Sequence, residues 1–185
     1  MAQAMVVYVA TQDGLITLSD PGGKGRWRQV GHTLQGRQVA AIRVASAMHL
    51  EVLTTAGALS STDGGKTWAP LATLPPELQP VSGAQRVVLA GPHETWLEAQ
   101  PDAHGQSHLL RSEDAGASWQ PATLTDGDPL EGTVTVMVPA SYHRDQAWAG
   151  TNAGHLLHTS DRGRTWQTIE RQLPGIMGLA PVRFL

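Results

Sequence analysis

The sequence has 185 residues, enough for one well-buried core, and its 13 basic and 16 acidic side chains give a formal net charge of −3. This mildly acidic balance lacks the positive field that non-specific binding to DNA or RNA requires. The longest apolar runs, such as residues 5–10, are far shorter than the roughly 20 residues of a membrane helix. We therefore expect one domain over residues 1–185, with no nucleic-acid partner and no membrane insertion.

The first residues and the absence of one residue type bear on location. The opening Met1-Ala2-Gln3-Ala4 has no basic segment, and the apolar run that follows is too short for a secretion signal. Cysteine is absent, which excludes disulfides and thiolate metal sites. The expected location is the cytoplasm.

Short β-branched runs separated by glycine and proline predict an all-β fold. In chain order, strands are expected at 5–11, at 39–45, 49–54, 58–61 and 68–71, at 86–90, 94–99 and 108–111, at 133–138, 146–150, 155–159 and 166–169, and at 179–185. Groups of four short antiparallel strands are what the blades of a β-propeller contain.

An eight-residue pattern, S-x-D-x-G-x-[ST]-W, recurs along the chain. Its defining residues are Ser61, Asp63, Gly65, Thr67 and Trp68 in one copy, Ser112, Asp114, Gly116, Ser118 and Trp119 in the next, and Thr159, Asp161, Gly163, Thr165 and Trp166 in the third. A degenerate copy covers residues 19–27. The tryptophans at 27, 68, 119 and 166 lie 41, 51 and 47 residues apart, which is a blade-sized period.

Each position of the pattern has a physical reason. An aspartate in a tight turn accepts hydrogen bonds from backbone N–H groups ahead of it, and the leading hydroxyl adds another bond. Glycine supplies the positive φ of the turn, and the tryptophan covers the turn with a large ring. These residues are therefore predicted to stabilise the fold and to carry no chemistry.

The three clean copies resemble the Asp-box, or BNR, repeat of sialidases, sortilin-type receptors and photosystem II assembly-factor-like propellers. The resemblance implies a β-propeller in which the boxes join the two outer strands of each blade, remote from the active site of a sialidase. The same blade hosts unrelated activities, so the resemblance says much about fold and little about function.

The expected architecture is therefore a propeller of four four-stranded Asp-box blades. Its repeats are expected at 1–37, 38–80, 81–132 and 133–178. The first repeat lacks an innermost strand, so residues 179–185 are expected to close the N-terminal blade. The alternative is a half-ring that pairs with a second copy, as a homodimer, into an eight-bladed propeller.

Sialidase-type catalysis would need an arginine cluster and a tyrosine activated by a glutamate. The tyrosines are only Tyr8 and Tyr142, and Arg43 and Arg86 fall out of register when the repeats are aligned. No Ser-His-Asp, phosphate-loop or HExxH pattern is present. We expect no catalytic residue and no cofactor.

Binding is expected on the face opposite the boxes. There the third repeat has an enlarged loop over residues 98–108, next to the connectors 74–80 and 126–131, and loop insertions of this kind often bind partners. The candidate residues are Glu77, Glu98, Asp102, His104, His108, Asp126, Asp128 and Glu131. Several of them could ligate a cation, but solvated loop residues are the commoner case and no metal is expected.

Two further pairs of residues could have either a structural or a ligand-binding role. His155 and His158 would point to opposite faces of one strand, so they are expected as a surface or edge pair and not as joint ligands. Trp96 and Trp148 suit packing between blades better than stacking on a sugar. The function favoured is a non-catalytic protein-binding or assembly scaffold, with a lectin-like carbohydrate binder and a sialidase-type glycoside hydrolase as alternatives.

Overall fold

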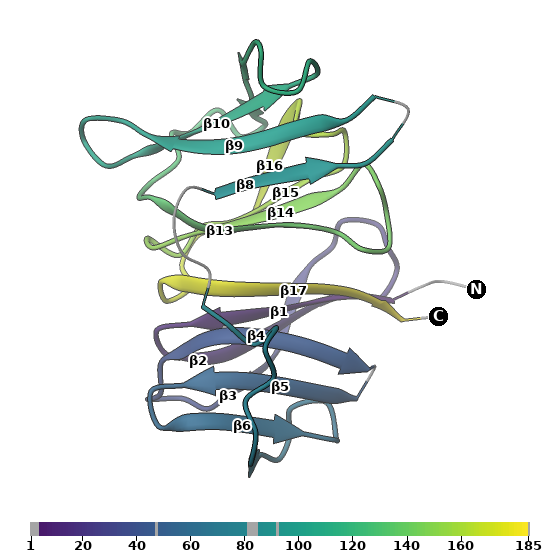
Figure 1. The fold of residues 1–185 in the computed structure, drawn as a ribbon, viewed down its shortest axis with the longest axis vertical. Helices are drawn as coiled ribbons and strands as arrows, with labels where there is room; N and C mark the ends of the chain where they lie inside the picture. The colour runs from purple at the N-terminus through teal and green to yellow at the C-terminus, as the bar shows by residue number, and fades with distance from the viewer. Residues whose placement is uncertain (1–3, 47, 81–84, 92, 185) are drawn as a thin grey trace. The chain divides into compact units, whose positions relative to one another are not determined.

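The computed structural model describes residues 4–46, 48–80, 85–91 and 93–184, and all regular structure in these ranges is β-strand, which confirms the all-β prediction (Figure 1). The strands form four sheets within the described residues. The chain divides into two compact units, one from residues 1–81 with 177–185 and the other from 82–176. The single domain and the repeat boundaries stay predictions.

The first sheet of the first unit brings the two ends of the chain together. Its strands, in spatial order, are β17 (Ile176–Phe184), β1 (Ala4–Thr11), β2 (Gly14–Asp20) and β3 (Arg28–Thr33). β17 lies beside β1, as Figure 1 shows, and begins earlier than the expected 179. The expected end of this strand at Leu185 lies outside the described residues.

The second sheet of this unit follows the chain without crossovers. Its strands are β4 (Val39–Ser46), β5 (His49–Thr54), β6 (Gly57–Ser61) and β7 (Ala69–Pro70). The core of the unit joins both sheets, because Val6, Tyr8 and Leu15 cluster with Leu50 and Val52. Side chains of β17, including Val182 and Phe184, pack against that cluster.

The second unit also contains two sheets. One consists of β8 (Gln85–Leu89), β9 (Thr95–Pro101), β10 (Ser107–Ser112) and β11 (Gln120–Pro121). The other consists of β13 (Val134–Pro139), β14 (Ala147–Thr151), β15 (Leu156–Thr159), β16 (Thr165–Glu170) and the short β12 (Thr123–Leu124).

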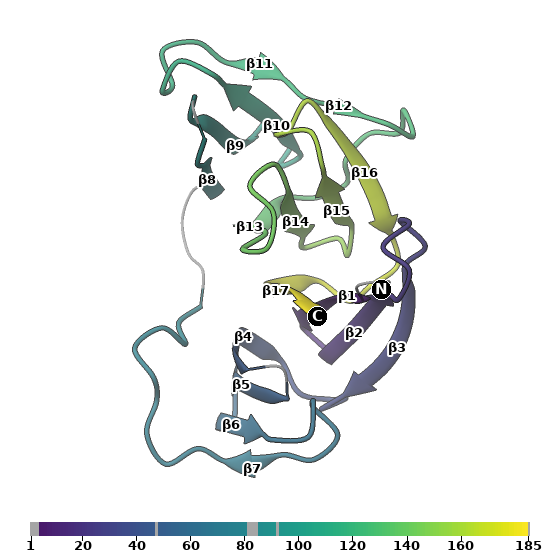
Figure 2. The same ribbon diagram turned by 90° about the vertical axis from the view of Figure 1, so that its right-hand side faces the viewer.

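The segment 120–125 belongs to both sheets of this unit, which strand prediction from sequence missed. Ala122 N donates to Leu109 O at 2.8 Å, and Thr123 N donates to Arg164 O at 3.0 Å. β11 therefore ends one sheet, and β12 pairs in parallel with β16 at the outer edge of the other (Figure 2). This bridge covers the edge of β16 that would otherwise lie open.

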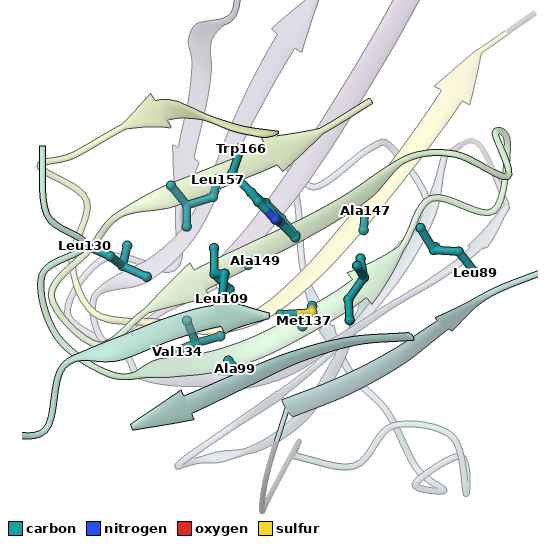
Figure 3. Close-up of a cluster of buried hydrophobic side chains, with 11 residues drawn as sticks. Leu89, Ala99, Leu109, Leu130, Val134, Met137, Ala147, Ala149, Leu157 and Trp166 are labelled. Carbon is teal, nitrogen blue, oxygen red and sulfur yellow. The ribbon is translucent and has the colours of Figure 1, made fainter. Parts of the chain in front are cut away.

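The core of the second unit is a cluster of buried apolar side chains between its two sheets (Figure 3). Leu97, Ala147, Ala149 and Leu157 are fully buried there, and Trp166 closes over them. Leu89 and Leu130 lie at opposite ends of the cluster in Figure 3. The end at Leu130 is the one next to the connector predicted to bind.

Candidate functional site

The hydroxyl groups that open the three clean boxes make the same two bonds. Each oxygen accepts from the backbone N–H of the glycine four residues ahead, and each donates to the aspartate two residues ahead. The pairs are Ser61 with Gly65 (2.8 Å) and Asp63 (2.7 Å), Ser112 with Gly116 (2.8 Å) and Asp114 (2.6 Å), and Thr159 with Gly163 (2.9 Å) and Asp161 (2.9 Å). The turn thereby satisfies its own polar groups.

The box carboxylates are held by donors of their own turns. Asp63 accepts from the Thr67 hydroxyl at 2.6 Å and from the backbone N–H of Thr67 at 2.9 Å. Hydrogen bonds from Thr67 hold the pKa of Asp63 far below its usual range, and those from Ser112 and Ser118 lower that of Asp114 to about 2. Such ionised, fully engaged groups cannot act as general acids near neutral pH.

In the degenerate first box, an aspartate stands where the other boxes have their leading serine or threonine. Asp20, the last residue of β2, is buried and accepts from Gly25 N at 2.6 Å through its Oδ2. It occupies the strand-end position of Ser61 in β6, where the hydroxyl accepts from Gly65 N. A carboxylate therefore replaces the hydroxyl as acceptor, across a loop one residue longer.

Arg162, a variable position of the third clean box, was missed by the sequence analysis. Its guanidinium donates to Asp145 Oδ1 at 2.8 Å and to Thr95 Oγ1 at 2.9 Å. It also donates to the carbonyl oxygens of Leu89 and His93, at 2.8 and 2.9 Å. One side chain thus fastens the β8–β9 turn to the box face of the neighbouring sheet. No signal in a single sequence singles out a variable box position.

On the opposite face, the expected loop 98–108 is mostly a β-hairpin. Gln100 pairs with His108 and Pro101 with Ser107, so the loop shrinks to residues 102–106. Glu98 was expected both in the strand 94–99 and in the loop: it lies within β9, so its place in the loop was wrong, and it is buried and accepts from Arg86 Nε at 2.6 Å. The strand ladder continues through residues that the sequence marked as a turn.

The hairpin loop is fastened to the connector that precedes β13. Thr133 Oγ1 donates to Gly105 O at 2.7 Å, and Ser107 N donates to Gly132 O at 3.1 Å. Val134 N donates in turn to Ser107 Oγ at 2.8 Å. These bonds hold the hairpin and the connector in a fixed relation.

A pocket of about 190 Å³ lies where the hairpin, the bridging segment and the connector meet. It is lined by Gln106, Ser107, His108, Leu109, Pro121, Ala122, Leu124, Pro129 and Leu130. Leu109 and Leu130 also belong to the core cluster, so the pocket floor is an accessible edge of that core. Of the candidate residues, only His108 lines it. The candidate residues taken from the sequence are all polar, whereas most of the residues that line this pocket are apolar.

Two other candidate residues, Asp102 and His104, come just before the pocket-lining residues 106–109 in the sequence. The Asp102 side chain lies 3.5 Å from His108 Nε2, and Asp102 Oδ1 accepts from the backbone N–H groups of His104 and Gln106 at 2.8 and 2.9 Å. These backbone bonds, Gln106 first, lower the pKa of Asp102 against the opposing effect of burial. The exposed His104 sits at the tip of the hairpin loop.

The connector carries its own ion pairs. Arg171 Nη2 lies 2.6 Å from Asp126 Oδ2 and 3.1 Å from Asp128 Oδ2. His155 Nε2 lies 3.8 Å from Glu131 Oε2. Burial, together with the nearby Arg171 charge, lowers the pKa of His155 against the pull of Glu131, so this imidazole is neutral at pH 7.

The remaining candidates lie apart from the pocket or away from solvent. Glu77 belongs to the first unit, where its charge acts on Arg43. The expectation of a surface pair at His155 and His158 was wrong, because His155 is buried and His158 is half-buried against Trp148. Trp148 itself is fully buried and offers no stacking face to a sugar.

Trp96 also has its ring covered. The Arg86 guanidinium lies 5.4 Å from the Trp96 ring centroid and 5.6 Å from that of Trp119, within the range of cation–π attraction. The box glycine Gly116 lies close to the same ring, since a Cβ added there would be 3.3 Å from Trp96 Cε3 and Cζ3. A protein side chain thus occupies the place that a sugar would need.

Within the described residues, no group of three or more histidine, aspartate or glutamate side chains is placed to hold a metal ion. The carboxylates and histidines considered for a cation site divide among the separate pairs described above. In the same part of the chain, no helix is long and apolar enough to cross a membrane.

Residues 59–70 match the family model of the BNR/Asp-box repeat, which confirms the resemblance at the copy that begins with Ser61. No curated protein sequence matches the chain. This family match covers one repeat and leaves the activity of the protein open.

Several solved structures resemble the chain. An ancestral GH74 enzyme is 21% identical with a TM-score of 0.38, over 88% of this chain and 22% of that one. YCF48 bound to D1 peptide is 21% identical with a TM-score of 0.33, over 75% and 44%. A protein of unknown function from Dyadobacter fermentans is 16% identical with a TM-score of 0.34, over 88% and 59%. The chain spans less than two thirds of each of these structures, and likenesses of this size assign no function to it.

Proposed function

We propose that this chain is a non-catalytic protein-binding module that uses the face opposite its Asp boxes. The observation that supports this most is the pocket between the hairpin, residues 121–124 and residues 129–130. Six of its nine lining residues are apolar, and Gln106, Ser107 and His108 are the polar ones. An apolar centre with a polar rim is the usual anatomy of a protein-binding surface.

The size of the pocket supports a side chain as its occupant. Pockets for cofactors and drug-sized ligands measure about 300–1,000 Å³, whereas this one measures about 190 Å³. An engineered cavity of about 150 Å³ holds a benzene molecule. The pocket therefore suits one ring or branched aliphatic group projecting from a larger partner.

The titratable groups support a non-catalytic role. The box carboxylates are bound within their turns, and Glu98, Asp126 and Asp145 each accept from an arginine. A general acid or base needs a group free to exchange a proton with a substrate. These carboxylates instead serve as fixed acceptors of the fold.

Affinity capture with pocket variants tests the proposal. Ala122→Trp places an indole in the pocket, and Ala117→Trp places the same group on an exposed box residue as the matched control. We expect proteins retained by the wild type and by Ala117→Trp to be lost with Ala122→Trp. Identical capture by all three proteins would remove the pocket as the binding site.

The proposal includes a propeller ring of four blades, one per sheet, closed within the chain by the pairing of β17 with β1. The alternative is a half-ring completed by a second copy. Sedimentation equilibrium separates them, because the closed ring requires the monomer mass of 19.7 kDa and the half-ring requires twice that mass.

A further inference from the structure

A second pocket, of about 320 Å³, lies within the second unit and shares no lining residue with the first. One wall consists of residues 88–90, at the end of β8. The other consists of residues 139–141 with His143 and Arg144, in the turn between β13 and β14. The volume falls in the range of pockets that hold small organic molecules, about 300–1,000 Å³.

The larger part of this lining is apolar. It consists of residues 88–90 with Pro139 and Ala140. Leu89 and Ala140 are buried, whereas Val88 is 43% exposed. A ligand with an apolar body would remove this valine surface from water, which is favourable.

The polar part of the lining consists of hydrogen-bond donors. Ser141, His143 and Arg144 are all exposed, and none of the described lining residues is acidic. The backbone N–H of Asp145 donates to His143 Nδ1 at 3.3 Å, so the proton of the neutral imidazole lies on Nε2. The lining thus offers a hydroxyl, an imidazole N–H and a guanidinium to an acceptor.

The charge of Arg144 is not balanced by its neighbour. Arg144 Nε lies 3.9 Å from Asp145 Oδ2, whereas Arg162 Nη1 lies 2.8 Å from Asp145 Oδ1. Two guanidinium groups therefore share one carboxylate, and the more distant one, on a side chain that is 71% exposed, lines the pocket. An anion in the pocket would meet this surplus of positive charge.

Arg162 also joins the two walls of the pocket to one another. It donates to the carbonyl oxygens of Leu89 and Ala90 on one side, at 2.8 and 3.3 Å, and to Asp145 on the other. The turn has bonds of its own, since Ala140 N donates to Gln146 O at 2.9 Å and His143 N donates to Ala140 O at 3.1 Å. Walls that are already fixed lose little conformational entropy when a ligand binds.

We propose that this pocket binds a small free carboxylic acid with an apolar body, in its ionised form. The guanidinium of Arg144 matches a carboxylate in charge and in the spacing of its paired donors, and Ser141 and His143 supply further donors. The apolar body covers Val88 and its neighbours. Inorganic phosphate or sulfate lacks such a body and would leave that surface in water. This binding is independent of the proposed function.

NMR titration of the full chain with sodium hexanoate tests the inference, with hexanamide as a neutral ligand of the same shape. Hexanoate should shift the backbone amides of residues 88–90 and 140–144 and saturate at roughly 1–10 mM, as expected for a ligand of this size. Hexanamide should bind about tenfold more weakly, because it has no charge for Arg144. High salt should weaken the binding of hexanoate.

Two pairs of variants separate charge from shape. Arg144→Gln should weaken hexanoate about tenfold and leave hexanamide unchanged. Arg164→Gln makes the same change of charge outside the pocket lining, at a side chain that is 59% exposed, and should bind as the wild type does. Val88→Trp should block both ligands, whereas Val30→Trp, at another exposed valine, should block neither.

The opposite outcomes would overturn the inference. Equal affinity for hexanoate and hexanamide, or equal losses in Arg144→Gln and Arg164→Gln, would show that Arg144 does not select an anion. Unchanged binding by Val88→Trp, or no saturable shift up to about 50 mM, would remove the pocket as a site. Matching thermal melting of the variants and the wild type would show that lost binding does not reflect unfolding. Ala122→Trp should bind hexanoate normally, so the proposed function can fail without this inference.

Discussion

The imidazole of His158 lies 4.4 Å from the ring of Trp148, centroid to centroid, with the planes tilted by 39°. The two residues pair across β14 and β15, and His158 Nε2 has Gln146 Oε1 at 3.4 Å. Burial, with a smaller contribution from His143, lowers the pKa of His158 to about 4. A half-buried ring whose pKa is lowered by folding makes the stability of the protein depend on pH.

The first prediction is a loss of stability as pH falls from about 6.5 to about 4. Above this window His158 is neutral in both folded and unfolded chains, and within it only the unfolded chain takes up the proton. The loss due to His158 should be about 2 kcal/mol between pH 7 and pH 5 and about 3 kcal/mol by pH 4. Urea denaturation at several pH values measures it.

His158→Phe is the control for this prediction, because it keeps an aromatic ring and removes the titration. The variant should show a much flatter dependence in the same window, with the residual slope coming from His155, whose pKa is lowered in the same direction. The box aspartates lose their stabilising ionisation only at lower pH, since hydrogen bonds lower their pKa values. An unchanged slope in His158→Phe would contradict the prediction.

The second prediction concerns Arg162. Arg162→Lys should destabilise the protein by about 2–4 kcal/mol, because lysine cannot reproduce the fork that binds Asp145, Thr95 and two carbonyl groups. Arg164→Ala is the control in the same box, since this side chain is 59% exposed and its pair with Glu113 should contribute less than about 1 kcal/mol. Thermal denaturation measures the loss of stability in each variant, and equal losses would contradict the role of Arg162 in fastening the β8–β9 turn.

The third prediction uses two glycines with nearly the same backbone and different surroundings. Gly163 has φ +79° and Gly105 has φ +77°, but an added Cβ would overlap Leu97 Cδ2 at the first and meets nothing within 4 Å at the second. Gly105→Ala should cost about 1–2 kcal/mol from backbone strain alone. Gly163→Ala should cost a further 1–3 kcal/mol, roughly, because Leu97 is fully buried and cannot move aside. Equal losses in chemical denaturation would contradict the packing argument.

The fourth prediction is that a chain ending at residue 176 loses the cooperative unfolding of the first unit. The truncation exposes the edge of β1 and removes Ala180, Val182 and Phe184 from contact with the core. Ending the chain at residue 184 is the control. Hydrogen exchange of the β1 amides measures the effect, and protection equal to that of the control would show that β17 is dispensable.

Part of this protein could be predicted from local sequence. The box turns follow from the spacing of residues such as Ser61, Asp63 and Gly65, because each side-chain bond of Ser61 and Asp63 joins residues no more than four positions apart. The strand positions follow from β-branched runs between turn residues, and the structure places most of them within one or two residues of the expected limits.

Misjudged features depended on partners distant in the chain. An enlarged loop was predicted over residues 98–108, whereas the pairing of β9 with β10 continues as far as Pro101. Burial of His155 and His158 depends on how sheets pack, whereas a surface or edge position was expected from their spacing along one strand. Spacing along a strand is a local property, whereas burial is decided by contacts between segments.

The sequence by itself determined the all-β character and the Asp boxes, because each rests on residues close together in the chain, and it predicted binding on the face opposite the boxes. Only the tertiary structure decided what that face contains. Leu109, Ala122 and Leu130 come from three segments, and they line one pocket only after β10, the bridge to β12 and the connector have packed. Arg162 likewise meets Leu89 and Thr95 from more than sixty residues away. Contacts of that range are fixed by the packing of sheets and have no counterpart in local sequence.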